Sequence, residues 1–254
     1  MNQDIRAIFL DLGGTFRIVT PDGAYTSAAK KLIAELVGTE IEPEAFYDLV
    51  MERYEDYRKW ALRFLCEAPE AMLWSRWLAP DYDRARVEKH AVELTYALRR
   101  AKGRRVVVPE GEETVKILVA RGYKVGVISD LVGTVEIDEW LDESGMRPYF
   151  CTVQQSSVTL LRKPHPAIYL LALNEAGVRP EQGVFVGDNL ERDIIGAKAV
   201  GFGATVAVDY PDAAPLKITD ENRPDGIIQS FTQLLDIFPA APGISLGAYE
   251  QRSV

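Results

Sequence analysis

Residues 7–15 read Ala-Ile-Phe-Leu-Asp-Leu-Gly-Gly-Thr. The first four residues are apolar without alternation, and the run ends at Asp11 and a glycine-containing turn. A short apolar run that is ended by turn residues is typical of a strand buried on both faces, as in a parallel sheet. The stretch therefore predicts a central buried strand with Asp11 at its carboxyl end.

The same pattern recurs further along the chain. Apolar runs at 124–128 and 183–186 end in Ser129-Asp130 and in Gly187-Asp188. Further strands are predicted at 150–153, 204–208 and 226–228, and helices at 112–121, 135–143, 166–176, 193–200 and 231–238. Strands that alternate with helices predict βαβ units, so the expected fold is a doubly wound parallel α/β sheet.

A second type of region separates the first two strands. Residues 24–101 have helical spacing and no strand pattern, with helices expected at 28–37, from Pro43 onward, and at 57–65, 72–78 and 84–100. Residues 105–109 read as an extended connector. We therefore divide the chain into an α/β core at 1–19 and 103–240, a small all-helical domain at 20–102, and a loosely held tail at 241–254.

Composition limits the partners. The 254 residues carry a net charge of -9. An acidic surface repels nucleic-acid phosphates and anionic membranes, so neither is expected as a partner. No stretch approaches the roughly 20 apolar residues of a membrane span, and the first residues lack a signal-peptide pattern, so we expect a cytoplasmic protein. Cys66 and Cys151 are expected to be reduced and mostly buried.

Polar residues follow three of the predicted strands. Asp11, Ser129 with Asp130, and Asp188 all stand where a strand ends, and Lys163 lies in a fourth segment. Ligands of such sheets bind at the carboxyl ends of the strands, so we expect these side chains to converge on one pocket.

That set of residues suits phosphoryl chemistry. The Asp11 carboxylate can attack phosphorus and form an aspartyl-phosphate. Asp188 and Asp193 offer the hard oxygen ligands that Mg²⁺ prefers, and the metal would screen the repulsion between nucleophile and phosphate.

Other residues can hold the phosphate itself. Thr15 and Ser129 can donate hydroxyl hydrogen bonds, and Lys163 adds a positive charge. Gly13 and Gly14 let backbone amides approach the phosphate closely.

Four motifs in order resemble those of the haloacid dehalogenase-like (HAD) hydrolase superfamily. They are Asp11-Leu12-Gly13-Gly14-Thr15, the apolar strand into Ser129, Lys163-Pro164, and Gly187-Asp188-Asn189 with Asp193. The resemblance spans roughly residues 5–238, and the helical region lies where that family places a helical cap.

The resemblance implies a role for each motif. Asp11 would be the nucleophile, and Ser129 and Lys163 would hold the transferring phosphoryl group. The implied Mg²⁺ ligands are Asp11, the backbone carbonyl of Gly13, Asp188 and Asp193. The implied substrate is a small phosphorylated molecule, held by Gly14, Thr15, Ser129, Asp130 and Lys163. A monomer and a homodimer are equally compatible with the sequence.

The sequence departs from the family's phosphatases at Gly13. These enzymes usually carry an aspartate there, which protonates the leaving group and then activates water. General acid–base help is worth ~10²–10⁴-fold, so ester hydrolysis should be slow unless something replaces it. One explanation is a leaving group that needs no proton, as in an acyl phosphate or a phenolic phosphate. A second explanation is that Asp130 replaces the missing general acid; the alternative interpretation of Asp130 is that it caps the following helix. Tyr25, Arg53 and Lys59 of the cap are further candidates for the substitute acid.

Three other functions compete with phosphate ester hydrolysis. A catalytically weak phosphate-binding or regulatory protein would explain Gly13. A phosphonatase would use Lys30, Lys31 or Lys59 as a Schiff base. A haloacid dehalogenase would also lack the second aspartate, but the retained Gly187-Asp188 favours metal and phosphate.

Several polar and aromatic residues have structural interpretations. His90 and His165 lack metal-ligand spacing. The expected core of the helical domain includes Tyr57, Trp60, Phe64, Trp74 and Trp77. Lys102, Arg104 and Arg105 are expected to form a solvated hinge where the cap returns to the core.

Overall fold

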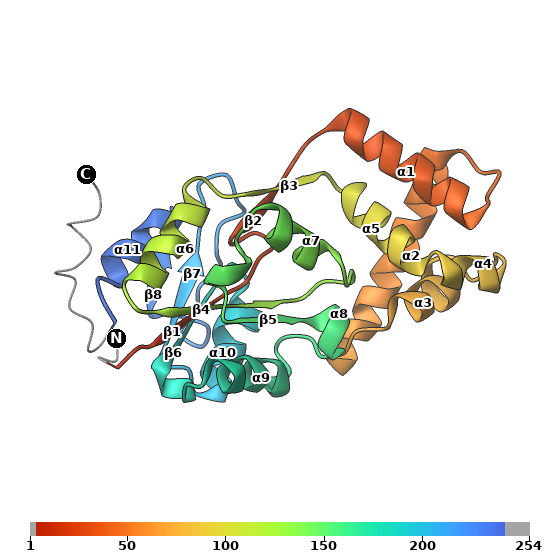
Figure 1. Cartoon of the computed structure of the whole chain (residues 1–254). Coiled ribbons are helices and arrows are strands. Elements are labelled where there is room, and N and C mark those ends of the chain that lie inside the picture. The colour runs from red at the N-terminus through yellow and green to blue at the C-terminus, as the bar shows by residue number, and fades with distance from the viewer. Residues whose placement is uncertain (1–3, 242–254) are drawn as a thin grey trace.

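A six-stranded parallel sheet forms the centre of the molecule in the computed structural model, which describes residues 4–241 (Figure 1). The strand order is β5-β4-β1-β6-β7-β8, and every neighbouring pair is parallel. The strands are β1 (Ala7–Leu10), β4 (Lys124–Ser129), β5 (Thr152–Gln155), β6 (Gly183–Gly187), β7 (Ala204–Val208) and β8 (Gly226–Ile228). The predicted doubly wound parallel sheet is confirmed, with β5 beginning two residues later than expected.

The central strand β1 explains why both faces of the sheet are covered. All four of its residues are fully buried. Ile8 and Leu10 belong to one apolar cluster, with residues of α6 (Gly111–Ala120), α7 (Glu136–Glu143) and α11 (Leu234–Ile237). Ala7 and Phe9 belong to the other, with α9 (Pro166–Ala176) and α10 (Gly196–Val200). Successive side chains point to opposite faces, so an apolar strand needs a helical layer on each.

The helical insert, residues 23–100, has an apolar core of its own. It comprises α1 (Gly23–Val37), α2 (Pro43–Phe64), α3 (Glu70–Met72), a π-helical turn η1 (Leu73–Leu78), α4 (Arg84–Lys89) and α5 (Ala91–Arg100). The Asp22 side chain caps α1 by accepting from the backbone N–H of Tyr25 at 3.0 Å, so α1 starts five residues before the predicted position. The expected helix at 84–100 is interrupted at His90.

Two strands that connect the core to the helical insert pair with each other. β2 (Arg17–Thr20) and β3 (Arg104–Val107) form an antiparallel ribbon in which Arg17 lies opposite Val107. Figure 1 shows the ribbon between the sheet and the helical insert. The sequence predicted only an extended connector here, because a pairing between segments more than eighty residues apart leaves no local pattern.

Short elements complete the described part of the chain. They are η2 (Arg147–Tyr149), α8 (Ser156–Thr159), η3 (Pro180–Gln182), the π-helical turn η4 (Leu190–Ile195) and η5 (Phe231–Gln233). Residues 242–254, most of the predicted tail, lie outside the described residues. Across residues 4–241, no helix combines the length and apolarity needed to cross a membrane. Cys66 is half-buried and Cys151 is exposed, so the predicted burial was wrong for Cys151.

Candidate active site

The carboxyl ends of β1 and β6 bring three carboxylates together. Asp11 follows β1, Asp188 follows β6, and Asp193 lies in the turn η4. One oxygen from each lies within 4.8 Å of the others. Asp11 and Asp193 are buried, and Asp188 is half-buried. Asp11 and Asp188 meet as their strand ends predicted, Asp193 joins them from η4, and the three oxygens suit a hard divalent cation.

Lys163 holds two of these carboxylates. Its Nζ lies 2.8 Å from Oδ1 of Asp11 and 2.7 Å from Oδ1 of Asp193, and its side chain is only 1% exposed. Burial alone would lower the pKa of Lys163, but the facing carboxylates of Asp11, Asp193 and Asp130 raise it above its usual value. The ammonium is therefore charged throughout the neutral range.

The carboxylates outnumber this ammonium. Burial and the nearby Asp11 raise the pKa of Asp188. Burial also raises the pKa of Asp193, to about 7, with repulsion from Asp11 and Asp188 adding to it while Lys163 opposes it. Buried like charges resist ionisation unless a further cation joins them. The cluster thus has the charge and the ligand type of a divalent-metal site.

Two glycines allow the aspartates to approach the backbone. A Cβ on Gly14 would lie 2.5 Å from Oδ2 of Asp188, and Gly14 also has a positive φ of 82°. A Cβ on Gly187 would lie 2.3 Å from the Asp193 carboxylate. Thr15 donates from Oγ1 to Oδ1 of Asp188 at 3.3 Å. These two glycines are required by the geometry of the acidic cluster.

Gly13 differs from these two glycines. Nothing lies within 4 Å of the position that its Cβ would occupy, and its φ lies outside the left-handed region. The residue is also exposed. Since neither sterics nor backbone conformation requires glycine here, an aspartate would fit at this position.

Asp130 contacts the segment that carries Lys163. Its Oδ1 accepts from the backbone N–H of Lys163 at 2.9 Å, and its Oδ2 lies 3.6 Å from Arg162 and 3.7 Å from Arg192. The idea that Asp130 caps the following helix is wrong, because no side chain caps α7. The carboxylate instead ties the Lys163 segment to the end of β4.

The other residues considered for the reaction are Ser129, the possible substitute acids of the cap and the possible Schiff-base lysines. Ser129 ends β4 and is 4% exposed. Arg53 donates to the carbonyl of Leu78 and to Asp81. The lysines pair with local carboxylates: Lys30 with Glu44, Lys31 with Glu35, and Lys59 with Asp56. Tyr25 stacks with Arg100 and Arg104. None of these contacts joins the candidates to the acidic cluster.

The structural interpretations hold for several residues. His165 caps α9 by accepting from Ala167 N–H at 3.2 Å. Trp60 and Trp77 contact each other with tilted rings whose centroids are 5.6 Å apart, and both pack against the core of the helical insert. The prediction was wrong for Phe64, which is 57% exposed at the end of α2 and is not part of that core. Trp74 is buried and donates to Thr95 at 2.8 Å.

A buried network that the sequence did not reveal joins the helical insert to the core. Glu67 accepts hydrogen bonds from Tyr57, Ser156 and Arg162, and its side chain is 0% exposed. The backbone of Glu67 also donates to the carbonyl of Leu160 at 3.0 Å. A single glutamate in a loop carries no sequence pattern, so only the fold shows this link to the segment before Lys163.

The prediction that Lys102, Arg104 and Arg105 form a solvated hinge was wrong for two of the three residues. Lys102 lies 4.2 Å from the centre of the Tyr54 ring, and Arg105 lies 3.4 Å from Glu136 with its side chain 12% exposed. Of the three hinge residues, Arg104 is exposed and pairs with Asp22 at 3.0 Å. Both Lys102 and Arg105 are only half-exposed, because Lys102 packs against Tyr54 of α2 and Arg105 contacts Glu136 of α7.

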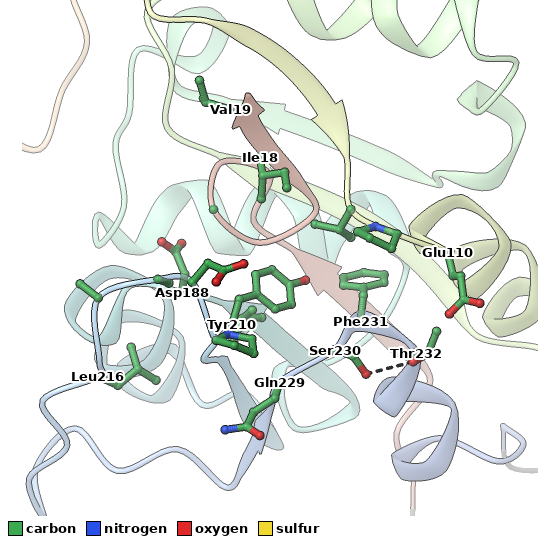
Figure 2. Close-up of a pocket in the computed structure, with 18 residues that line it drawn as sticks. Ile18, Val19, Glu110, Asp188, Tyr210, Leu216, Gln229, Ser230, Phe231 and Thr232 are labelled. Carbon is green, nitrogen blue, oxygen red and sulfur yellow. Dashed lines mark hydrogen bonds between the residues drawn. The ribbon is translucent and has the colours of Figure 1, made fainter. Parts of the chain in front are cut away.

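A large apolar cavity opens beside Asp188. Its volume is about 730 Å³, and its lining includes Ile18, Leu216 and Phe231. Figure 2 shows Asp188 at the edge of this cavity next to Tyr210. Tyr210 donates to the backbone carbonyl of Thr15 at 2.7 Å. The acidic cluster is therefore reachable from this side.

Comparison with known proteins places this geometry in a family. The haloacid dehalogenase-like hydrolase family matches residues 5–201. The chain belongs to this family. The match includes all four motifs and the helical insert.

Curated members of the HAD family include two similar phosphatases. The chain is 28% identical to the glyceraldehyde 3-phosphate phosphatase of Pyrococcus furiosus over 246 residues, which cover 94% of this chain and 95% of that protein. It is 26% identical to the phosphoserine phosphatase of Thermus thermophilus over 248 residues, which cover 85% and 96%.

Solved structures show the same HAD fold. A 2-haloacid dehalogenase from Pseudomonas syringae superimposes with a TM-score of 0.67 at 22% identity, over 92% of this chain and 98% of that one. A HAD phosphatase from Thermococcus onnurineus gives a TM-score of 0.59 at 21% identity, over 92% and 97%. Since the fold carries both activities, the site has to distinguish them.

Proposed function

We propose that this HAD hydrolase is a magnesium-dependent phosphatase that acts on a small phosphorylated metabolite through an aspartyl-phosphate at Asp11. The observation that carries the proposal is the acidic cluster of Asp11, Asp188 and Asp193, which Lys163 contacts at 2.7–2.8 Å. Its negative charge favours a divalent cation, and a bound cation would in turn hold an anionic phosphate. The phosphatases among its relatives support the same reaction class.

The donor set fits Mg²⁺. Asp11, Asp188 and Asp193 would supply carboxylate oxygens, with the Gly13 carbonyl beside them. When bound, Mg²⁺ would neutralise charge on the carboxylates and on the phosphoryl group.

Asp11 is positioned to act as the nucleophile. Its Oδ1 is bound by Lys163, so Oδ2 is the oxygen that attacks phosphorus. The P–O bond to the leaving group breaks as the new P–O bond to Asp11 forms, and the leaving oxygen keeps the electron pair. Lys163 and the Ser129 hydroxyl would hold the phosphoryl oxygens during this transfer. Water then hydrolyses the aspartyl-phosphate and regenerates Asp11.

Asp130 would position Lys163 in this reaction. Its carboxylate accepts from the Lys163 backbone and lies between two guanidinium groups. The arrangement fixes the chain on either side of the ammonium. We therefore assign Asp130 to orientation of the phosphate-binding lysine.

Gly13 defines the preferred substrates. Without a carboxylate at this position, an alkyl leaving group departs unprotonated, which is slow. Acyl and phenolic phosphates carry leaving groups that need no proton. The helical insert would act as a cap that closes over the substrate and excludes water.

Phosphate release with and without Mg²⁺ tests the proposal. The panel is acetyl phosphate, para-nitrophenyl phosphate, glyceraldehyde 3-phosphate and phosphoserine. We expect Mg²⁺-dependent release, faster by ~10²-fold or more from the first two compounds. Release that does not depend on a divalent cation, or no release from any compound, would contradict it and favour the phosphate-binding alternative that Gly13 suggests.

A further inference from the structure

A second charged cavity lies where the helical insert meets the core. It has a volume of about 230 Å³, which is several times the roughly 30 Å³ that a water molecule occupies. Its walls come from α1 and α5 on one side, from the β2–β3 ribbon, and from α7 of the core. It includes none of the residues of the acidic cluster.

Arginines dominate the lining of this cavity. Five arginines and three glutamates line it, together with Tyr25, Tyr96 and Trp140. The arginines are Arg17, Arg99, Arg100, Arg104 and Arg105, and the glutamates are Glu136, Glu139 and Glu143. Asp22, outside the lining, pairs with Arg104. The group therefore keeps a net positive charge even when Asp22 is included.

Glu136 is shared by three of the arginines. Its carboxylate lies 2.6 Å from Arg99, 3.2 Å from Arg17 and 3.4 Å from Arg105. Glu139 and Glu143 are exposed on α7, where water screens their charge. The buried part of the cluster thus holds three guanidinium groups around one carboxylate.

Arg100 has no carboxylate partner within residues 4–241. Its guanidinium lies 4.6 Å from the centre of the Tyr25 ring and 5.8 Å from that of Tyr96. The Nε atoms of Arg17 and Arg100 are buried and make no hydrogen bond within the described part of the chain. Arg17 is only 8% exposed. Buried donors without acceptors are costly and add to the unfavourable electrostatics of the cluster, which an oxyanion in the cavity would offset through its negative charge.

The acid–base properties of the cluster agree with an excess of positive charge. Burial lowers the pKa of Arg105 to about 10, and repulsion from Arg99 and Arg17 adds to this effect. Burial, then Arg99 and Arg105, also lower the pKa of the neighbouring Lys102, to about 8. A bound anion would relieve this repulsion.

We propose that this cavity, the hinge cavity, binds a small oxyanion, with phosphate as the model ligand, at a site separate from the catalytic centre. The ligand would lie against the guanidinium groups of Arg17 and Arg100 and contact both the helical insert and the core. Its binding would therefore stabilise the arrangement of the two parts seen here. The proposal does not depend on phosphatase activity.

The test measures binding of inorganic phosphate to the full chain by calorimetry, in EDTA so that no divalent metal supports binding at the acidic cluster. We expect one binding site. Arg100→Gln should weaken phosphate at least about tenfold, because a charge-assisted hydrogen bond is lost. Glu143→Gln should tighten phosphate binding, since it removes an exposed negative charge at the cavity. Citrate in place of phosphate distinguishes a general oxyanion site from one selective for phosphate.

Three controls keep the result interpretable. Ser129→Ala, at the catalytic centre, should leave phosphate affinity unchanged. Arg147→Gln, an exposed arginine of the core, should also have no effect. Thermal unfolding in the absence of phosphate checks that Arg100→Gln is folded. If it is not, the tighter phosphate binding expected for Glu143→Gln, a change at an exposed residue, still tests the proposal. Binding that weakens in Ser129→Ala but not in Arg100→Gln would overturn the proposal, and so would binding that neither variant changes. The proposal would also fail if no binding is measurable at about 10 mM phosphate, because the site would then lack even millimolar affinity.

Discussion

The proposed catalytic centre and the hinge cavity have opposite charge imbalances. At the proposed catalytic centre, three carboxylates lie together and the ammonium of Lys163 contacts two of them. At the hinge cavity, three guanidinium groups surround the carboxylate of Glu136. Both clusters are largely buried, so solvent does not neutralise either one.

The comparison shows how a charge imbalance identifies a ligand. Burying like charges together is unfavourable unless a counter-charge joins them. The excess of carboxylate oxygens suits a divalent cation, whereas the excess of guanidinium donors suits an oxyanion. The two sites also differ in origin, because strand ends build the first and segments from both the helical insert and the core build the second.

The largest effect should follow from removal of Asp11, the proposed nucleophile. Asp11→Asn should lower the rate of phosphate release by at least about 10³-fold, because an amide does not attack phosphorus. Steady-state kinetics with acetyl phosphate measure the loss. Asp48→Asn, a matched change on the exposed side of α2, should retain full activity. An Asp11→Asn variant with near-normal turnover would show that the acidic cluster is not the catalytic centre.

The next largest effect should come from the shared carboxylate of the hinge cavity. Glu136→Gln should destabilise the fold by about 3–5 kcal/mol, because three buried guanidinium groups lose their counter-charge. Chemical denaturation measures the change, and phosphate should recover part of it. Glu139→Gln, on the same helix but exposed, serves as the control. Equal stabilities of the two variants would mean that the arginines tolerate each other without a counter-ion.

The lowered pKa of Glu136 also predicts that the protein loses stability in acid. Burial alone would raise its pKa, but Arg99, Arg105 and Arg17 together lower it to about 2. A lowered pKa contributes stability above the unfolded value near 4.5, and that stability is lost as pH falls toward 2. The Glu136→Gln variant should lack this part of the acid transition.

A gain of activity should follow when the missing carboxylate is restored. Gly13→Asp should raise hydrolysis of alkyl phosphates by ~10²-fold, since general acid catalysis becomes available and the position has room for a side chain. Gly14→Asp is the contrasting change, because a Cβ there would collide with Asp188. If Gly13→Asp is folded and binds Mg²⁺ but gains nothing, an acid already exists elsewhere or the scaffold is a binding protein.

The smallest effect is a pH dependence of metal affinity. Burial raises the pKa of Asp193 to about 7 in the metal-free protein, so a proton must leave before its carboxylate binds a cation. Affinity for Mg²⁺ should fall about tenfold per pH unit below 7 and level off above it. Calorimetry in buffers of different ionisation enthalpy would detect the released proton. A constant affinity between pH 5.5 and 7 would mean that Asp193 is ionised before metal binds.

Local patterns allowed much of the core to be predicted. The apolar run before Asp11 indicated a strand buried on both faces, and that strand is the centre of the sheet. The prediction that the strand-end aspartates converge also follows from a general property of parallel sheets, whose carboxyl ends share one edge. Helix boundaries were less accurate where capping decided them, as at Asp22, whose side chain starts α1 earlier than periodicity indicated.

The sequence by itself determined the parallel α/β fold, the order of the motifs and the identity of the acidic residues, because each depends on local periodicity or on strand ends. Tertiary structure alone decided which oxygens Lys163 contacts, where the Asp130 carboxylate points and that Arg17, Arg99 and Arg105 share Glu136. Those contacts join segments that are far apart along the chain. Their energies depend on burial and distance in three dimensions, and neither quantity has a signature in the local order of residues.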